Sequence, residues 1–266
     1  MPTSSEDSLI VRLRSLASAG ATDSQLHSEC GSLIDEYTPL AKKAYWAFAH
    51  VMRRAGTSPT LSKGDFIELH LHAWKRYLVA AARMAFSDSA EQPNSNPSER
   101  ILTVGWHFPE YPYHLQSAVS AGALILVAQR SDWMYSAVPH SNLFCFRGTE
   151  SMTPLVRAFR NGRQVVVMMD YCYDETSHTV VNFLGYPART PSGVLTLAAR
   201  FGYQITSGNH TERCSLVEAK VTGTKSVPEL ALAINSHLEQ EILAAPAEWL
   251  LWASVDRRWI GVDYES

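Results

Sequence analysis

Short apolar runs alternate with helical segments along the second part of this 266-residue chain. Residues 101–106, 123–129 and 164–169 have the length of strands and contain few polar side chains. Residues 113–120 and 152–160 lie between them and show helical periodicity. Strands that are apolar on both faces belong to a parallel sheet with helices on both sides. The pattern therefore predicts an α/β fold with a mainly parallel central sheet flanked by helices.

The C-terminal part of the chain continues this alternation. Residues 192–201 form a predicted helix that ends at Gly202, and residues 203–207 and 215–221 are predicted strands. Ser226 and Glu229 have the spacing of a capping box. They predict the start of a helix that continues to Ile242.

The first 86 or so residues are predicted to be helical. Apolar residues recur at helical spacing in residues 24–34, 39–54 and 63–86. His70 and His72 are two positions apart and face different sides of a helix, so no metal site is predicted there. A polar, proline-punctuated linker follows at residues 87–99. We expect an N-terminal helical region with its linker (residues 1–99) and an α/β domain (residues 100–266) that form one compact unit.

Composition excludes several classes of protein. With 46% hydrophobic and 18% charged residues, the chain can build a large globular core. A net charge of −3 without a long basic run gives no reason to expect nucleic acid as a partner. Four scattered cysteines without a CxxC pair predict neither a disulfide framework nor a zinc site. The sequence shows no signal peptide and no apolar stretch of membrane-spanning length, so we expect a cytoplasmic protein, with peripheral membrane contact left open.

Side chains suited to catalysis follow three of the predicted strands. The three loops hold His107 and Glu110; Arg130, Asp132 and Trp133; and Asp170, Asp174 and Glu175. The carboxyl ends of parallel strands meet at one edge, where ligands bind. A histidine there can exchange a proton near neutral pH, and a neighbouring carboxylate can orient its ring. Turn capping by Asp170 and surface pairing of Arg130 with Asp132 would explain the same residues, and spacing alone does not decide.

Five ordered blocks between about residue 100 and residue 260 carry a family resemblance. They are His107-Phe-Pro-Glu-Tyr-Pro112 with the strand that ends at Arg130; residues 155–162 with the strand that ends at Asp170; residues 182–193, which contain Phe-Leu-Gly-Tyr-Pro-Ala-Arg-Thr; residues 197–202; and residues 246–252 with Arg257-Arg-Trp259. This set resembles the bacterial lipid A biosynthesis (lauroyl/myristoyl) acyltransferases, which are lysophospholipid acyltransferase-like.

The chain departs from that family in two places. The family motif is a histidine followed, after four residues, by Asp or Glu, and this chain has Pro112 there. Another carboxylate would have to orient the ring of His107: we expect Glu110 first, because it is nearest in sequence, and then Asp170, with Glu175 a further candidate. The family's usual N-terminal membrane anchor is not recognisable either. The two departures argue against a housekeeping lipid A enzyme and predict a divergent soluble member.

The resemblance implies the chemistry of acyl transfer. In the family, a histidine acts as general base on an acceptor that attacks an acyl thioester, which makes His107 the base, with Glu110 or Asp170 as its acid. Arg130 and Arg213 are candidates for contacting the donor phosphate or the oxyanion. Phe108, Tyr111, Trp133 and Phe183 are candidates for an acyl or aromatic acceptor pocket, although surface pairing and core packing explain such residues as well. No metal and no tightly bound cofactor is expected, since the phosphopantetheine-linked donor is a substrate.

Three functional hypotheses follow. The first is a soluble acyltransferase of specialised metabolite biosynthesis that moves an acyl group from a carrier-protein or CoA thioester to an amine or hydroxyl. Its acceptor would be a small molecule or a carrier-bound group, and an acyl carrier or peptidyl carrier protein its partner. The second is a peripheral membrane glycolipid acyltransferase. The third, motivated by Pro112, is a thioesterase or a non-catalytic scaffold that binds acyl carriers.

Overall fold

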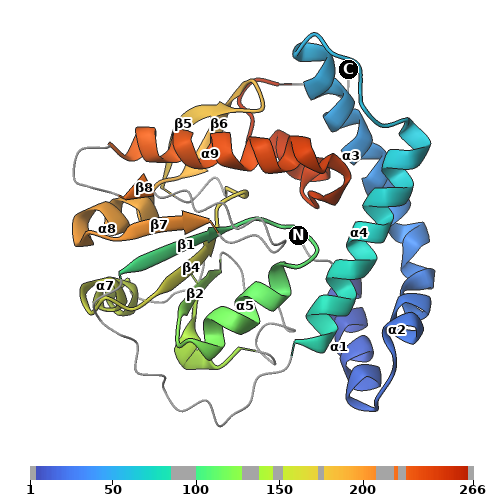
Figure 1. The fold of residues 1–266 in the computed structure, drawn as a ribbon, viewed down its shortest axis with the longest axis horizontal. Coiled ribbons are helices and arrows are strands. Elements are labelled where there is room, and N and C mark those ends of the chain that lie inside the picture. The colour runs from blue at the N-terminus through green and yellow to red at the C-terminus, as the bar shows by residue number, and fades with distance from the viewer. Residues whose placement is uncertain are drawn as a thin grey trace.

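A computed structural model describes residues 4–84, 100–127, 138–145, 152–172, 177–207, 219–220 and 226–262. Its N-terminal region is helical, as predicted, and lies on one side of the molecule in Figure 1. The helices of this region are α1 (Ser4–Ser18), α2 (Asp23–Glu29), α3 (Ile34–Arg54) and α4 (Lys63–Arg83), with a short 3-10 turn, η1 (Cys30–Leu33). None of the helices in the described part of the chain combines the length and the apolar character needed to cross a membrane.

The central sheet confirms the predicted α/β class. Its five parallel strands lie in the order β3-β2-β4-β1-β7, and the two-residue strand β8 pairs antiparallel with β7 at the edge. The strands are β1 (Ile101–Gly105), β2 (Leu124–Val127), β3 (Leu143–Cys145), β4 (Val165–Met168), β7 (Gln204–Ser207) and β8 (Ala219–Lys220). The carboxyl ends of the parallel strands point towards the N-terminal helices in Figure 1, which places those helices beside the edge where ligands are expected.

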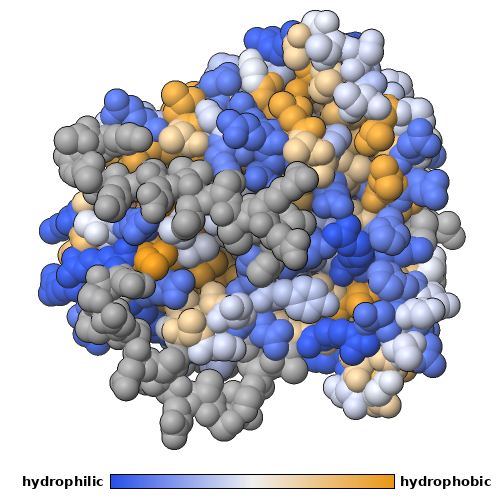
Figure 2. All heavy atoms as spheres, viewed as in Figure 1, coloured by the Kyte–Doolittle hydropathy of each residue, from blue (hydrophilic) through white to orange (hydrophobic). Residues whose placement is uncertain are grey.

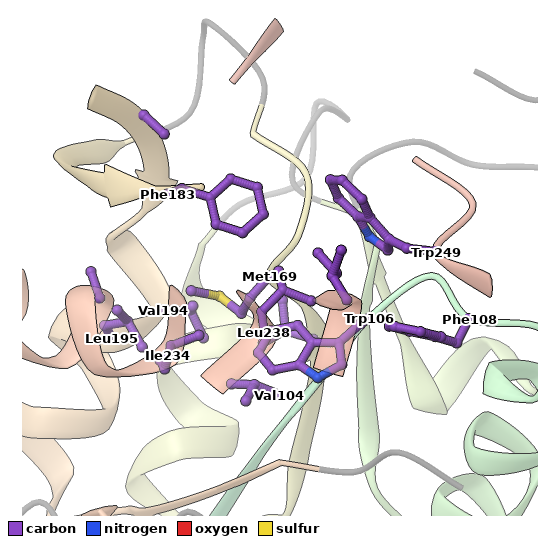
Figure 3. Packing of buried hydrophobic residues seen from close by; sticks show 14 of the residues in the cluster. Val104, Trp106, Phe108, Met169, Phe183, Val194, Leu195, Ile234, Leu238 and Trp249 are labelled. Atoms are coloured by element: carbon purple, nitrogen blue, oxygen red, sulfur yellow. The ribbon is translucent and has the colours of Figure 1, made fainter. Parts of the chain in front are cut away.

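Helices cover both faces of the sheet. Successive strand residues point to opposite faces, so the apolar strands present side chains to helices on each side. One apolar cluster contains Leu102 and Val104 of β1 together with residues of α7 (Thr153–Arg160), α8 (Gly193–Phe201) and α9 (Val227–Ala244). Figure 3 shows part of it, with Trp106, Met169 and Leu238 gathered between strands and helix. A second cluster joins Ile125 and Val166 to α5 (Tyr111–Ser120) on the other face.

The N-terminal helices contribute to both clusters. Phe48 of α3 and Phe66 of α4 belong to the first cluster, and Ile10 and Tyr77 belong to the second. Phe48 also packs edge to face on Trp252, in the 3-10 turn η4 (Trp252–Arg257) near the C-terminus. The helical region therefore shares its hydrophobic core with the sheet.

A β-hairpin formed by β5 (His178–Phe183) and β6 (Tyr186–Pro191) was not predicted. Its two-residue loop has positive φ at both positions, 53° at Leu184 and 81° at Gly185. Loops of this kind are signalled by Asn-Gly or Asp-Gly, and a leucine gives no such signal. Tertiary contacts hold Leu184 instead: its side chain is buried, and its backbone amide donates to the Glu239 carboxylate of α9.

Candidate active site

His107 and Asp170 follow two neighbouring strands. β1 ends at Gly105, β4 ends at Met168, and these two residues are partners in the parallel ladder. The Met169 amide extends the ladder by donating to the Gly105 carbonyl at 3.1 Å. The expectation that Asp170 ends a neighbouring strand is therefore correct, and the sheet itself brings the two loops together.

The Asp170 carboxylate contacts His107 through both oxygens. Oδ1 lies 2.7 Å from the ring Nδ1, and Oδ2 accepts from the His107 backbone amide at 2.6 Å. An ionised carboxylate only accepts hydrogen bonds, so Nδ1 carries the proton and donates it. The Asp170 side chain has no exposed surface, whereas the His107 side chain is 26% exposed. Within the described segments Nε2 has no hydrogen-bond partner, so this nitrogen can accept a proton from a ligand.

The charge of Asp170 is stabilised although the residue is buried. Burial alone would raise its pKa, but the neighbouring His107 charge and the hydrogen bonds from His107 and Trp249 lower the pKa of Asp170 below its ordinary value. The Trp249 indole Nε1 donates to Oδ2 at 2.9 Å. Trp249 is itself fully buried, and Figure 3 shows its ring in the same apolar cluster as Phe183.

A buried cation, Arg258, supports the loop that carries Asp170. Its guanidinium donates to the Asp170 carbonyl at 3.4 Å and to Asn235 Oδ1 at 3.0 Å, and lies 4.0 Å from the centre of the Phe183 ring. Burial lowers the pKa of Arg258 to about 10, against the opposing charges of Asp170, Cys172 and Glu239. Arg258 therefore remains protonated at neutral pH.

Two tyrosines pack behind the histidine ring. Tyr111 meets the ring of His107 edge to face, with ring centroids 5.2 Å apart, and stacks in turn on Tyr77 of α4 at 5.5 Å. Tyr111 and Tyr77 are both buried. The predicted substrate-binding residue Tyr111 thus lies at the site, where it supports the ring of His107.

The expected order of the two candidate acids, Glu110 before Asp170, was wrong. Glu110, the residue nearest in sequence, directly precedes α5 and forms an ion pair with Arg76 of α4. Asp170 is the carboxylate that meets the imidazole, although it lies 63 positions further along the chain. Parallel pairing of β1 with β4 brings this distant residue to His107, whereas the start of α5 directs Glu110 towards the N-terminal helices.

The other predicted site residues fall into two groups. Phe183 is fully buried and packs on Trp249 with ring centroids 5.8 Å apart, while Phe108 is also buried in the same cluster. Both side chains therefore lie in the apolar core beside the site. The remaining candidates lie outside the described residues: Arg130, Trp133 and Arg213, with Asp132, Asp174 and Glu175.

Sequence reasoning missed the contacts of Trp249 and Arg258 with Asp170, and the ion pairs that join Arg76 to Glu110 and Glu248. Trp249 and Arg258 lie within the C-terminal blocks that resembled the family, but no role was derived for them. Arg76 and Glu248 carried no signal, because their partners are distant in sequence. In the described segments, no group of three or more His, Cys, Asp or Glu side chains comes together in a way that could hold a metal ion.

The arrangement has the parts of a general base: a partly open imidazole, a buried carboxylate that fixes its tautomer, and donors that stabilise the carboxylate. Residues 129–259 match the family model described as bacterial lipid A biosynthesis acyltransferase. The match includes Asp170, Trp249 and Arg258 and begins after His107. No curated protein matches the chain. The family match agrees with the ordered blocks that fall inside it, and it supports membership of the bacterial lipid A biosynthesis acyltransferase family.

Proposed function

We propose that this acyltransferase moves an acyl group from a carrier-protein or CoA thioester to an amine or hydroxyl acceptor in specialised metabolite biosynthesis. The contact between His107 and Asp170 carries the proposal, because it supplies an oriented base at the ligand-binding edge of the sheet. Family membership supports the acyl transfer. The departure from the family motif at Pro112 supports an acceptor other than a lipid A precursor, since the acid of the site has been relocated.

In the proposed reaction, Nε2 of His107 removes the proton of the acceptor as its oxygen or nitrogen attacks the thioester carbonyl. Asp170 keeps the other proton on Nδ1 and stabilises the imidazolium that forms, as the buried carboxylate does in serine hydrolases. The tetrahedral intermediate then collapses, the carbon–sulfur bond breaks, and the thiolate takes the proton from Nε2. Arg130 and Arg213 stay candidates for stabilising the oxyanion or the donor phosphate.

The test uses the purified protein with acyl carrier and CoA thioesters, a metabolite extract as the source of acceptors, and mass spectrometry of the products. We expect His107→Ala to lower turnover by at least about 10²-fold, since base catalysis contributes roughly 10²–10⁴-fold. Asp170→Asn should cause a loss of similar size, because the amide favours the wrong tautomer. His72→Ala, which alters an exposed histidine of α4, is the control and should keep its activity.

Near-normal turnover of His107→Ala at saturating donor would reject His107 as the base. Release of free fatty acid at the same rate with and without acceptor would instead identify a thioesterase. Binding of acyl carriers without any acyl transfer or hydrolysis by the intact protein would favour the scaffold hypothesis.

Exposed apolar side chains on the N-terminal helices favour a second candidate, a peripheral membrane glycolipid acyltransferase. Leu40 and Trp46 of α3 and Leu69 of α4 are each more than two-fifths exposed. Figure 2 shows apolar side chains at the surface of this helical region among hydrophilic ones. Flotation with liposomes separates the two candidates. A peripheral membrane enzyme should rise with the vesicles, whereas an enzyme that uses a water-soluble acceptor should stay in the lower fractions of the gradient.

A further inference from the structure

Arg76 of α4 binds two carboxylates that belong to different loops. Its Nη2 pairs with Glu110, and its Nη1 donates to Oε1 of Glu248 at 2.7 Å. Glu110 closes the loop that carries His107, and Glu248 lies in the 3-10 turn η3 (Pro246–Glu248), far along the chain. One guanidinium fork therefore joins the N-terminal helices to both segments.

Each carboxylate is the immediate neighbour of a residue that touches the catalytic pair. Glu110 precedes Tyr111, whose ring packs edge to face on His107. Glu248 precedes Trp249, whose indole donates to Asp170. The next amide, that of Leu250, donates to the carbonyl of His107 at 2.9 Å. A displacement of either loop would therefore be transmitted to the ring of His107 or to the carboxylate of Asp170.

A second residue of α4 holds the same C-terminal turn. His70 is fully buried, and its Nδ1 donates a hydrogen bond to the carbonyl of Ala247 at 2.8 Å. With Ala247 fixed by His70 and Glu248 fixed by Arg76, α4 contacts two successive residues of η3. This helix thus supports the turn that leads to Trp249.

The ion pairs of Arg76 contribute little to the stability of the fold. The side chains of Arg76, Glu110 and Glu248 are 33%, 26% and 36% exposed, and pairs in contact with solvent are typically worth about 0–1 kcal/mol. Their geometric effect is larger, since a misplacement of about 1 Å in an active site can lower the rate by roughly 10²-fold. Activity is therefore the property in which a role of Arg76 would appear.

We propose that Arg76 is a positioning residue of the acyl transfer, which holds Glu110 and Glu248 so that their loops present His107, Asp170 and Trp249 in the reactive geometry. The inference rests on the proposed function. It also gives Glu110 a different role, as an anchor for Arg76 rather than as the acid of the base.

The kinetic test compares Arg76→Ala and Arg76→Lys with Arg83→Ala. Arg83 is a matched control, because it lies on the same helix, is also 33% exposed, and pairs with Asp23 in the N-terminal region. We expect Arg76→Ala to lower kcat by about 10-fold with little change in KM for the donor. Arg76→Lys should recover only part of the loss, since lysine lacks the fork that reaches two carboxylates. Arg83→Ala should stay within about 2-fold of the unmodified enzyme.

A double-mutant cycle tests whether Arg76 acts through its partners. Glu110→Gln and Glu248→Gln should each lower kcat by up to about 10-fold, less than His107→Ala, and Arg76→Ala should add little to either change. Fully additive losses in the cycle, or equal kcat values for Arg76→Ala and Arg83→Ala, would overturn the proposal.

Hydrogen–deuterium exchange at the Leu250 amide gives a readout that needs no activity. It should be faster in Arg76→Ala than in Arg83→Ala, while amides of the central strands exchange alike in both variants. If Arg76→Ala does not fold, the two glutamine variants are measured in its place. An intact protein without acyl transfer would refute the proposed function, whereas unchanged exchange at Leu250 would refute the positioning role alone.

Discussion

At the scale of single residues, the surroundings of a histidine decide what it can do. His107 is partly open and faces a buried carboxylate, whereas His70 is fully buried and faces a backbone carbonyl. Burial lowers the pKa of His70 to about 4, and its hydrogen bond to Ala247 opposes that shift. His70 is therefore neutral at pH 7 and serves as a structural contact, while His107 has the partner that stabilises a charged ring.

The depressed pKa of His70 predicts that the fold loses stability in acid. Between pH 6.5, the ordinary histidine value, and about pH 4, the unfolded chain binds a proton that the folded protein does not. The free energy of unfolding should therefore fall by up to about 3 kcal/mol as the pH drops through this window. Urea unfolding at pH 7.5, 5.5 and 4.5 measures this fall in the free energy of unfolding for the unmodified protein and for His70→Asn. The asparagine can still donate a hydrogen bond to the carbonyl of Ala247.

The asparagine variant cannot take up that proton, so its stability should change less with pH. Other titrating groups are the same in both proteins, and the difference between the two curves isolates His70. Parallel curves from pH 7.5 to pH 4.5 would contradict the assignment of the shift to this residue.

At the scale of elements, the helix α9 shows how local sequence and tertiary contacts combine. Its N-terminus is a capping box of Ser226 and Glu229, as predicted, and the Ser226 amide donates to the Glu229 carboxylate at 2.7 Å. Further along, Asn235 donates to the Asn182 carbonyl of β5 and to Thr190 of β6. The capping box sets where the helix begins, and its buried polar residues hold the hairpin and Arg258.

Replacing the capping residue should destabilise the protein by a modest amount. We expect Ser226→Ala to lower the free energy of unfolding by about 1 kcal/mol, because the first turn of α9 loses its side-chain cap. Ser236→Ala, at an exposed position in the middle of the same helix, is the control and should be neutral or slightly stabilising. Urea midpoints of the two variants measure the difference, and equal midpoints would show that the cap contributes nothing.

The elements themselves were predicted unequally well. The helices and the parallel strands β1, β2, β4 and β7 appeared at the expected places, because apolar periodicity is a local property that survives in the fold. The short strand β3 was not predicted. The first strand was correct to within one residue at its end, and Gly202 ends α8 in the left-handed conformation with φ of 69°. The β5–β6 hairpin was missed, since its turn at Leu184 depends on contacts with α9 rather than on turn-forming residues.

At the scale of the whole molecule, the N-terminal helices pack against the sheet and against the candidate active site. They supply Phe48 and Phe66 to the cluster that covers one face of the sheet. They also supply His70 and Arg76 to the C-terminal turn beside Trp249. A division of the chain at residue 99 therefore separates regions that differ in pattern but share one core.

Residues 100–266 alone should fail to fold cooperatively. Without the helices, the apolar surfaces around Trp252 and Trp249 would be exposed to water, and each large buried side chain contributes roughly 1.5–3 kcal/mol. Near-ultraviolet circular dichroism and urea unfolding should show weak tertiary packing in this fragment. The control is the full chain cut once between residues 92 and 93, which keeps both parts in solution. A fragment that unfolds as sharply as the cut chain would disprove the shared core.

The sequence by itself determined the class of fold, the helical first third, the position of His107 at the end of a strand and the family resemblance. These follow from periodicity and from short motifs, which depend on neighbours along the chain. The tertiary structure alone decided which acid meets the imidazole, because parallel pairing of β1 with β4 brings Asp170 to His107 and leaves Glu110 with Arg76. The same holds for Trp249, Arg258 and Arg76: their contacts join segments that no local pattern connects, and only the packing of sheet and helices brings them together.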